Sequence, residues 1–189
     1  MEWEQFLDPY VQAVGELKVK LRGIRKQYRK QQRHSPIEFV TGRVKSIESI
    51  QEKMVMHGIS LENLDRDMND IAGLRIMVQF EDDITEVLKV LRQRKDMKIV
   101  LERDYITYKK PSGYRSYHVI VEYPVDTIDG NKVVLAEIQI RTLAMNFWAT
   151  IEHSLNYKYK GEFPQEIKER LEITARIAYE LDKTMGEIR

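Results

Sequence analysis

The chain of 189 residues contains no cysteine, no long apolar run and almost no net charge. Without cysteine, the chain cannot form disulfides, thiol nucleophiles or thiolate metal sites. No segment approaches the roughly 18 apolar residues of a membrane span, and the first residues lack the basic and apolar stretches of a secretory signal. A net charge of +1 gives the whole chain no general attraction to nucleic acid. We therefore expect a globular cytoplasmic protein with no membrane contact.

The length predicts one folded domain over residues 1–189, and 42% of the residues are hydrophobic and can fill a core. Apolar residues recur at steps of three and four near both ends, which predicts long helices within residues 1–33 and 164–189. The second apolar seam consists of Ile167, Leu171, Thr174, Ala178, Leu181, Met185 and Ile188. Each seam could pack on the same domain or on another subunit, and we expect both helices in oligomer contacts.

The middle of the chain alternates between helical and strand patterns. Strands are expected at 74–80, at 98–104, at 114–123 and around Glu137, with a hairpin turn at Asp129-Gly130. Helices are expected from Ser35-Pro36 to about His57, after Asp82 and Asp83, and over residues 143–159 with an apolar face of Phe147, Ile151 and Leu155. This order predicts an α+β fold with a mixed, mostly antiparallel sheet flanked by helices. Because no glycine-rich phosphate loop is present, side chains would have to hold phosphates.

Two of the expected strands, about sixty residues apart, combine an acid with an arginine. Glu137, Gln139 and Arg141 share one face of the later strand, since side chains alternate along a strand. Asp70 stands at the start of the earlier strand, which carries Arg75. If the strands are neighbours, the two acids can hold a divalent cation while the arginines neutralise phosphates, as phosphoryl transfer requires. The alternative is an ordinary sheet with one solvated face.

Lysine and serine recur at helical spacing in the segment before the first acid. Lys45, Ser49 and Lys53 stand at positions i, i+4 and i+8, which would place two ammonium groups and a hydroxyl on one helix face. Such a face can bind a polyphosphate chain. A solvated face of an ordinary helix is the alternative.

Polar residues also share a face of the expected helix 143–159. Asn146, His153 and Tyr157 are separated by seven and four residues. An imidazole at such a position can bind phosphate or orient a hydroxyl, although a lone histidine is more often structural.

A basic loop leads into the strand at 114–123. Lys109 and Lys110 precede Tyr114, and Ser116 and His118 follow it on one face. An aromatic ring beside cations suits a nucleotide, because the base offers a flat π face and the phosphates offer negative charge. A tyrosine that belongs to the core is the alternative.

Four blocks of sequence resemble the signature of the RelA/SpoT-type (p)ppGpp synthetase domain. They are Asp-Ile-Ala-Gly-Leu-Arg at 70–75, Ser-Gly-Tyr-Arg-Ser-Tyr-His at 112–118, Glu-Ile-Gln-Ile-Arg-Thr at 137–142 and Trp-Ala-Thr-Ile-Glu-His at 148–153. The length, the basic first helix and the segment Ser-Pro-Ile-Glu-Phe-Val-Thr-Gly-Arg at 35–43 resemble the RelQ branch of small alarmone synthetases. No His-Asp dipeptide of the related hydrolase domain occurs. The resemblance therefore implies stringent-response alarmone synthesis without hydrolysis.

The resemblance implies a nucleotidyltransferase-like fold and transfer of pyrophosphate from ATP to the 3′-hydroxyl of GDP or GTP. Asp70 and Glu137 would hold Mg²⁺, and Glu137 would also help to deprotonate the attacking hydroxyl. The residues implied for ATP are Arg43 and Arg75 around adenine, and Lys45, Ser49, Lys53, Arg103 and His153 near the phosphates. The residues implied for the acceptor nucleotide are Tyr114, stacked on guanine, and Lys110, His118, Gln139 and Asn146.

A basic stripe of Lys18, Arg22, Arg25 and Arg29 borders the apolar seam of the first helix. Like charges that converge at a subunit junction are tolerated mainly when an anion binds there. The RelQ-like resemblance implies a homotetramer with (p)ppGpp as an allosteric activator, and Phe39 and Thr41 could link that anion to the ATP site. A solvated basic face is the alternative.

Two other functions fit part of the pattern. A nucleotidyltransferase that moves a nucleoside monophosphate would use the same acids, Mg²⁺ and basic cleft. An RNA-binding module, or RNA as a regulator, could use the basic stripe together with the loop at Lys109 and Lys110, and its affinity would fall steeply with salt.

Overall fold

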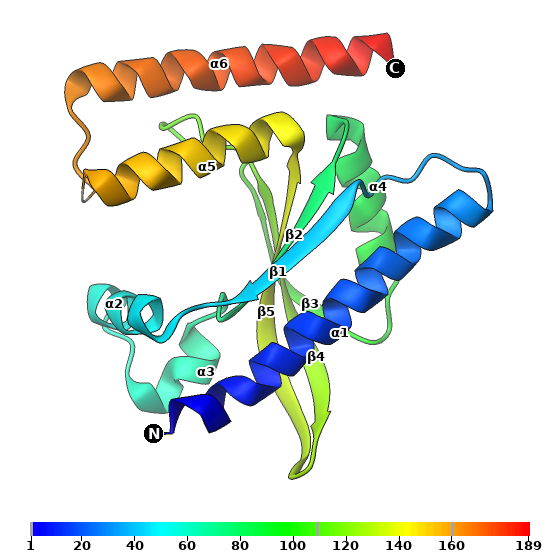
Figure 1. The fold of residues 1–189 in the computed structure, drawn as a ribbon, viewed down its shortest axis with the longest axis vertical. Helices are drawn as coiled ribbons and strands as arrows, with labels where there is room; N and C mark the ends of the chain where they lie inside the picture. Colours follow the sequence, from blue (N-terminus) through cyan, green and yellow to red (C-terminus); the bar gives the residue numbers. More distant parts are fainter. Residues whose placement is uncertain (1, 109, 160) are drawn as a thin grey trace.

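A five-stranded mixed sheet forms the centre of the computed structural model, which describes residues 2–108, 110–159 and 161–189 (Figure 1). The strand order is β1-β2-β5-β4-β3, and only the β2–β5 pair is parallel. The strands are β1 (Phe39–Val44), β2 (Ala72–Val78), β3 (Lys98–Asp104), β4 (Tyr117–Thr127) and β5 (Gly130–Thr142). The helices are α1 (Trp3–Lys30), α2 (Ile47–His57), α3 (Leu64–Asp67), α4 (Glu81–Arg92), α5 (Leu143–Lys158) and α6 (Gln165–Ile188), with a 3-10 turn at Leu61–Asn63. The predicted mixed α+β architecture is confirmed.

The central strands agree with the sequence-based prediction, but the segment before α2 does not. Strand β3, the hairpin between β4 and β5, and helix α4 lie where the sequence predicts them. The helix predicted from Ser35-Pro36 is wrong, because residues 39–44 pair antiparallel with β2 as an edge strand. Helix α2 starts only after Ser46, whose side chain accepts a hydrogen bond from the Ser49 backbone N–H at 3.3 Å.

Helix α1 lies across one face of the sheet and supplies much of the core (Figure 1). Leu17 and Leu21 are fully buried, so the apolar seam of α1 packs on its own domain. At Gly42 of β1 an added Cβ would lie 2.9 Å from Val14 Cγ1, closer than real Cβ contacts allow. Glycine therefore lets α1 approach the edge strand closely.

Helices α5 and α6 pack on each other beside one end of the sheet (Figure 1). The predicted apolar face of α5 is wrong in part, because Phe147 is 71% and Ile151 46% exposed. Trp148 is the residue that packs inward, and its ring N–H donates to the Leu171 carbonyl of α6 at 3.1 Å. The α6 seam is also wrong beyond its middle, since the buried residues of α6 are Leu171, Ala175 and Asp182, while Leu181, Met185 and Ile188 are exposed.

Among the described residues, no helix is long and apolar enough to cross a membrane.

Candidate active site

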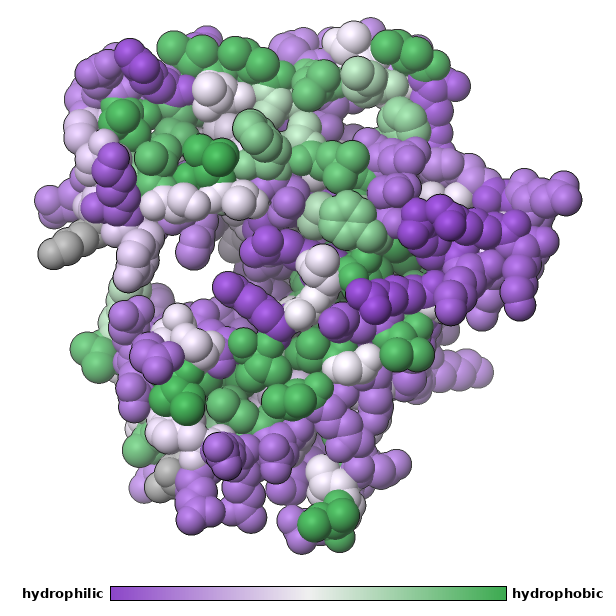
Figure 2. Space-filling model, in the orientation of Figure 1, coloured by the Kyte–Doolittle hydropathy of each residue, from purple (hydrophilic) through white to green (hydrophobic). Residues whose placement is uncertain are grey.

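A polar cleft lies on the face of the sheet opposite α1, over β1, β2 and β5. The molecule is hollowed between its α5–α6 side and its α2 side (Figure 2). The parallel register aligns Gly73 of β2 with Glu137 of β5, and Asp70 precedes β2 by two residues. The two predicted strands are therefore neighbours, which was the condition for the two acids to meet. The residues that line the cleft are Thr41, Gly42, Arg43, Lys45, Asp70, Gly73, Leu74, Arg75, Glu137 and Gln139.

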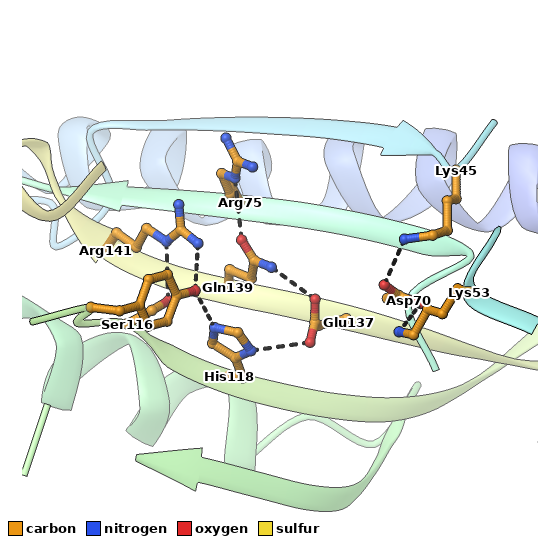
Figure 3. A network of polar contacts seen from close by, with 10 residues as sticks. Lys45, Lys53, Asp70, Arg75, Ser116, His118, Glu137, Gln139 and Arg141 are labelled. Carbon is orange, nitrogen blue, oxygen red and sulfur yellow. Dashed lines mark hydrogen bonds and ion pairs between the residues drawn. The ribbon is translucent and has the colours of Figure 1, made fainter. Parts of the chain in front are cut away.

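Asp70 is bound by two lysines at one end of the cleft (Figure 3). Lys45 Nζ lies 2.9 Å from Oδ2, and Lys53 Nζ lies 2.9 Å from Oδ1. Burial raises the pKa of Asp70, but the hydrogen bonds and charges of the two lysines outweigh burial and lower the pKa below its ordinary value. Lys45 lies before α2, so the prediction that Lys45, Ser49 and Lys53 share one helix face is wrong. The two lysines nevertheless come together at the Asp70 carboxylate.

Glu137 lies at the centre of a chain of polar contacts on the same face (Figure 3). Because a carboxylate only accepts, His118 donates from Nδ1 to Oε1 at 3.1 Å, and Gln139 donates to Oε2 at 2.8 Å. Arg75 in turn donates to Gln139 Oε1 at 3.2 Å. Burial raises the pKa of Glu137, but the hydrogen bond and charge of His118 and the bond from Gln139 lower it overall, against the opposing charge of Asp70. Glu137 is thus an ionised carboxylate near neutral pH.

Tyr114 closes the other end of this chain. Its hydroxyl lies 2.8 Å from His118 Nε2 and accepts a hydrogen bond from the Arg141 guanidinium at 2.6 Å. Lys110 and Arg141 lie 5.2 Å from the centre of the Tyr114 ring, and Tyr105 packs edge-on against it. The tyrosine is therefore half-buried beside two cations, and not a member of the main core.

Two arginines stand on neighbouring strands of the cleft. Arg43 of β1 and Arg75 of β2 both line it, and burial together with the charges of Arg141 and Arg43 lowers the pKa of Arg75. Two guanidinium groups that line one cleft favour an electron-rich or anionic ligand.

The remaining predicted residues lie at different distances from this network. Arg103 of β3 pairs across the sheet with His118, and Ser49 lies in the first turn of α2, where its hydroxyl accepts from Ser46. Asn146 lies in the first turn of α5 with its side-chain oxygen buried. The His153 side chain is exposed and makes no hydrogen bond or ion pair with another described side chain. Lys109 lies outside the described residues.

The residues predicted to bind an effector do not all share one pocket. Arg22, Arg25 and Phe39 line a second cavity, formed by α1 and β1 together with Lys26, Arg29, Ile37 and Val40. Thr41 instead lines the cleft with Asp70, and Lys18 packs against Gly42 of the same strand. Strand β1 thus contributes to both cavities.

Sequence reasoning missed part of the contacts around Tyr114. Arg141 was expected to neutralise phosphates, but its bonds to Tyr114 and to Ser116 Oγ, the latter at 3.1 Å, could not be foreseen. Tyr105 had no signal at all, because it lies in a turn where no periodicity applies. The alternation of strand side chains was the signal for Arg141, which follows Glu137 by four residues.

Two carboxylates in this cleft fit Mg²⁺. Magnesium usually takes one or two protein carboxylates and completes its shell with substrate phosphates and water. Asp70 and Glu137 line one cleft and are close enough for the charge of one to affect the pKa of the other. No group of three or more histidine or acidic residues suited to a metal occurs in the described ranges, so phosphate oxygens would have to supply the remaining ligands.

Acids, lysines and arginines around a cleft on a mixed sheet define a protein that handles nucleotide phosphates. The chain belongs to the RelA/SpoT family, because the family model described as "Region found in RelA / SpoT proteins" matches residues 42–162. That region spans strands β2 to β5 and helix α5, and so includes both acids.

Several similar proteins match over the whole chain. GTP pyrophosphokinase YjbM of Bacillus subtilis (strain 168) is 60% identical over 188 residues, which cover 100% of this chain and 89% of that protein. A solved structure of a GTP pyrophosphokinase family protein from Streptococcus pneumoniae has 74% identity and a TM-score of 0.97, covering 100% of this chain and 93% of that one. The structure of small alarmone synthetase 1 from Bacillus subtilis, bound to its product pppGpp, has 60% identity, a TM-score of 0.96, and coverage of 100% and 96%.

Proposed function

We propose that this chain is a (p)ppGpp synthetase, a GTP pyrophosphokinase that transfers pyrophosphate from ATP to the ribose 3′-hydroxyl of GDP or GTP and does not hydrolyse the product. The observation that carries the proposal is the pair of acids, Glu137 on β5 and Asp70 just before the parallel strand β2. Lysines bind Asp70, and Tyr114 lies at the far end of the polar contacts around Glu137. Such a cleft can hold two nucleotides end to end with their reacting groups between them. The activity of the full-length relatives supports the same assignment.

The two ends of the cleft suit two different nucleotides. In this proposal Arg43 and Arg75, which line the cleft, hold the adenine of ATP between them. Lys45 and Lys53, which contact Asp70, bind its phosphates. Both lysines contact Asp70, so they can exchange that carboxylate for phosphate oxygens when ATP arrives with its cation. Ser49, Arg103 and His153 remain further candidates for phosphate contacts.

The acceptor nucleotide would occupy the Tyr114 end. Its guanine would stack on the Tyr114 ring, as bases do on aromatic side chains. Lys110, His118, Gln139 and Asn146 would contact the sugar and phosphates. In this proposal a donor on that nucleotide would bond to the side-chain oxygen of Asn146, which is buried and has no hydrogen-bond partner in the described structure.

The reaction moves a pyrophosphoryl group between the two nucleotides. The 3′-oxygen of the acceptor forms a bond to the β-phosphorus of ATP, the bond from that phosphorus to the α,β-bridging oxygen breaks, and AMP leaves. Glu137 accepts the hydroxyl proton, while His118 and Gln139 hold its carboxylate in place. Mg²⁺, held by Asp70 and Glu137, would neutralise charge on the transferred phosphates.

The assay for this function is incubation with ATP, GDP or GTP and Mg²⁺, followed by separation of the nucleotides. We expect AMP and a guanosine nucleotide with two additional phosphates in equal amounts. Glu137→Gln should form neither, while Glu122→Gln, which changes a β4 acid outside the cleft, should form both. Absence of the guanosine product with the folded wild-type protein would contradict the proposal.

The second cavity supports regulation by the product. Its guanidinium groups are partly engaged within the chain, since Arg22 donates to the Val40 carbonyl at 3.1 Å and Arg25 to Glu38 at 3.1 Å. A (p)ppGpp molecule in this cavity would compete for those groups and act on β1, whose Thr41 lines the active cleft. We include Lys18, Phe39 and the homotetrameric state in this proposal.

Regulation can be tested separately from catalysis. Added pppGpp should raise the initial rate or shorten a lag, and Arg22→Ala combined with Arg25→Ala should remove that response and leave the basal rate unchanged. An identical activation curve in the double variant, or a monomer by light scattering, would contradict the proposed regulation by the product.

RNA as a regulator would show affinity that falls steeply with salt. The substrates are cytoplasmic metabolites, which supports a cytoplasmic location.

A further inference from the structure

A buried ion pair joins α6 to the segment that leads into β4. Arg115 is 5% and Asp182 6% exposed, and the Arg115 guanidinium lies 3.0 Å from Asp182 Oδ2. A second nitrogen of Arg115 pairs with Glu81 at the start of α4. Buried ion pairs are often no more stabilising than apolar residues of similar volume. Stability alone is therefore a weak reason for this pair.

The segment around Arg115 alternates between α6 and the cleft. Tyr114 and Ser116 both accept hydrogen bonds from Arg141, at 2.6 and 3.1 Å, on the cleft side. Arg115 lies between them and turns the opposite way, to Asp182. Asp182 therefore binds this segment on the side opposite to the Tyr114 ring.

The same alternation occurs at the end of β5. Arg141 points to the cleft, while the next residue, Thr142, donates from its hydroxyl to Asp182 Oδ2 at 2.9 Å. Asp182 Oδ2 thus binds the side chains of Arg115 and Thr142. These two residues are the chain neighbours of Tyr114 and Arg141, which contact each other. The loop also touches α6 directly, because Gly113 has φ 86° and an added Cβ would overlap the Cβ of Ala175.

We propose that Asp182 is a positioning residue for the acceptor nucleotide, which holds Tyr114 and Arg141 in register through Arg115 and Thr142. The inference rests on the proposed function, since it assumes that the acceptor base stacks on Tyr114. Asp182 does not contact the cleft, and the lysines that hold Asp70 belong to α2 and the turn before it. Loss of Asp182 therefore affects the acceptor end of the cleft and leaves the ATP end unchanged.

The test compares binding of the two nucleotides to Asp182→Ala and Asp182→Asn. Calorimetry with GDP and, separately, with the ATP analogue AMPCPP gives both dissociation constants. We expect Asp182→Ala to weaken GDP binding roughly tenfold, because the Tyr114 ring loses its support, and AMPCPP binding by less than about twofold. Asp182→Asn keeps an oxygen for Thr142 and Arg115 and should give an intermediate loss.

The matched control is Glu180→Gln, which removes the same charge from an exposed position of α6 and should leave both constants unchanged. Circular dichroism shows whether each variant is folded. If Asp182→Ala does not fold, the affinities of Asp182→Asn for the two nucleotides test the proposal instead. Equal weakening of GDP and AMPCPP would overturn the inference, because it indicates a general structural role. Unchanged GDP affinity in the folded variant would overturn it too. If the wild type itself neither binds GDP nor makes product, the proposed function fails first.

Discussion

The Tyr114 hydroxyl can be separated from the Tyr114 ring by substitution with phenylalanine. In Tyr114→Phe the ring remains for base stacking, but His118 and Arg141 each lose a hydrogen-bond partner. Arg141 is 4% exposed, so water does not readily replace the lost bond. We therefore expect Tyr114→Phe to lower the stability of the protein while it changes acceptor binding only slightly.

The magnitude follows from the contacts of Arg141. A hydrogen bond to a charged group contributes about 1.5–3 kcal/mol, and the remaining bond to Ser116 at 3.1 Å places the cost near the lower end. A loss of about 1.5 kcal/mol in a chain of this size lowers Tm by roughly 3–6 °C. In Tyr114→Ala the stacking surface is lost as well, so GDP affinity falls by a further 1–3 kcal/mol, or roughly 5- to 150-fold.

Thermal denaturation and calorimetric titration with GDP measure the two effects on the same samples. We expect Tyr114→Phe to melt earlier than the wild type yet to bind GDP within about threefold of it, and Tyr114→Ala to be impaired in both. Tyr108→Phe, an exposed tyrosine of the same loop, is the control. An unchanged Tm in Tyr114→Phe would refute the reasoning about the hydroxyl, and unchanged GDP affinity in Tyr114→Ala would refute stacking.

Three further perturbations test the acids and the cation. Asp70→Asn should lower the rate of synthesis on the order of a thousandfold without unfolding the chain, and the exposed acid Asp67 gives the control Asp67→Asn; retention of a tenth of the rate would contradict a catalytic role. The pKa of Glu137 is lowered from its ordinary 4.5, so its stabilising contribution is present above that pH and is lost as the pH falls through the lowered folded value. Urea denaturation from neutral to acidic pH should therefore show a steeper loss of stability for the wild type than for Glu137→Gln, and parallel curves would argue against the His118 contact. Removal of divalent cations with EDTA should abolish synthesis and excess Mg²⁺ should restore it, whereas full activity in EDTA would exclude the proposed metal.

The sequence predicted the centre of the fold better than its edges. Strands β2 and β5 are buried on one face and polar on the other, so their alternation was clear and their side chains are oriented as expected. The edge strand β1 was missed because the proline at 36 resembled a helix start, although Phe39, Val40 and Thr41 are residue types that favour strands. Some apolar residues of α5 and of the second half of α6 were assigned to the wrong face, since periodicity does not show which of two apolar stripes packs inward.

The same limit applies to the cleft. Spacing along the chain indicated that Asp70 and Glu137 could meet, and the parallel register of β2 and β5 brings them to one cleft. The contact of Lys45 and Lys53 with Asp70 depends on the turn before α2, which no periodic pattern encodes. The pairing of Arg115 with Asp182 joins residues 67 positions apart on elements whose relative placement follows only from tertiary packing.

The central claim, transfer of an intact pyrophosphoryl group, is tested most directly by the position of an isotopic label. Reactions are run with GDP and with ATP labelled either in the γ-phosphate or in the α-phosphate, and the guanosine product is isolated and counted. The account predicts that the γ label enters the guanosine product in full and that the α label stays in AMP. Transfer of the α label to the guanosine product, with the γ label released as pyrophosphate, would contradict it and identify a nucleotidyltransferase.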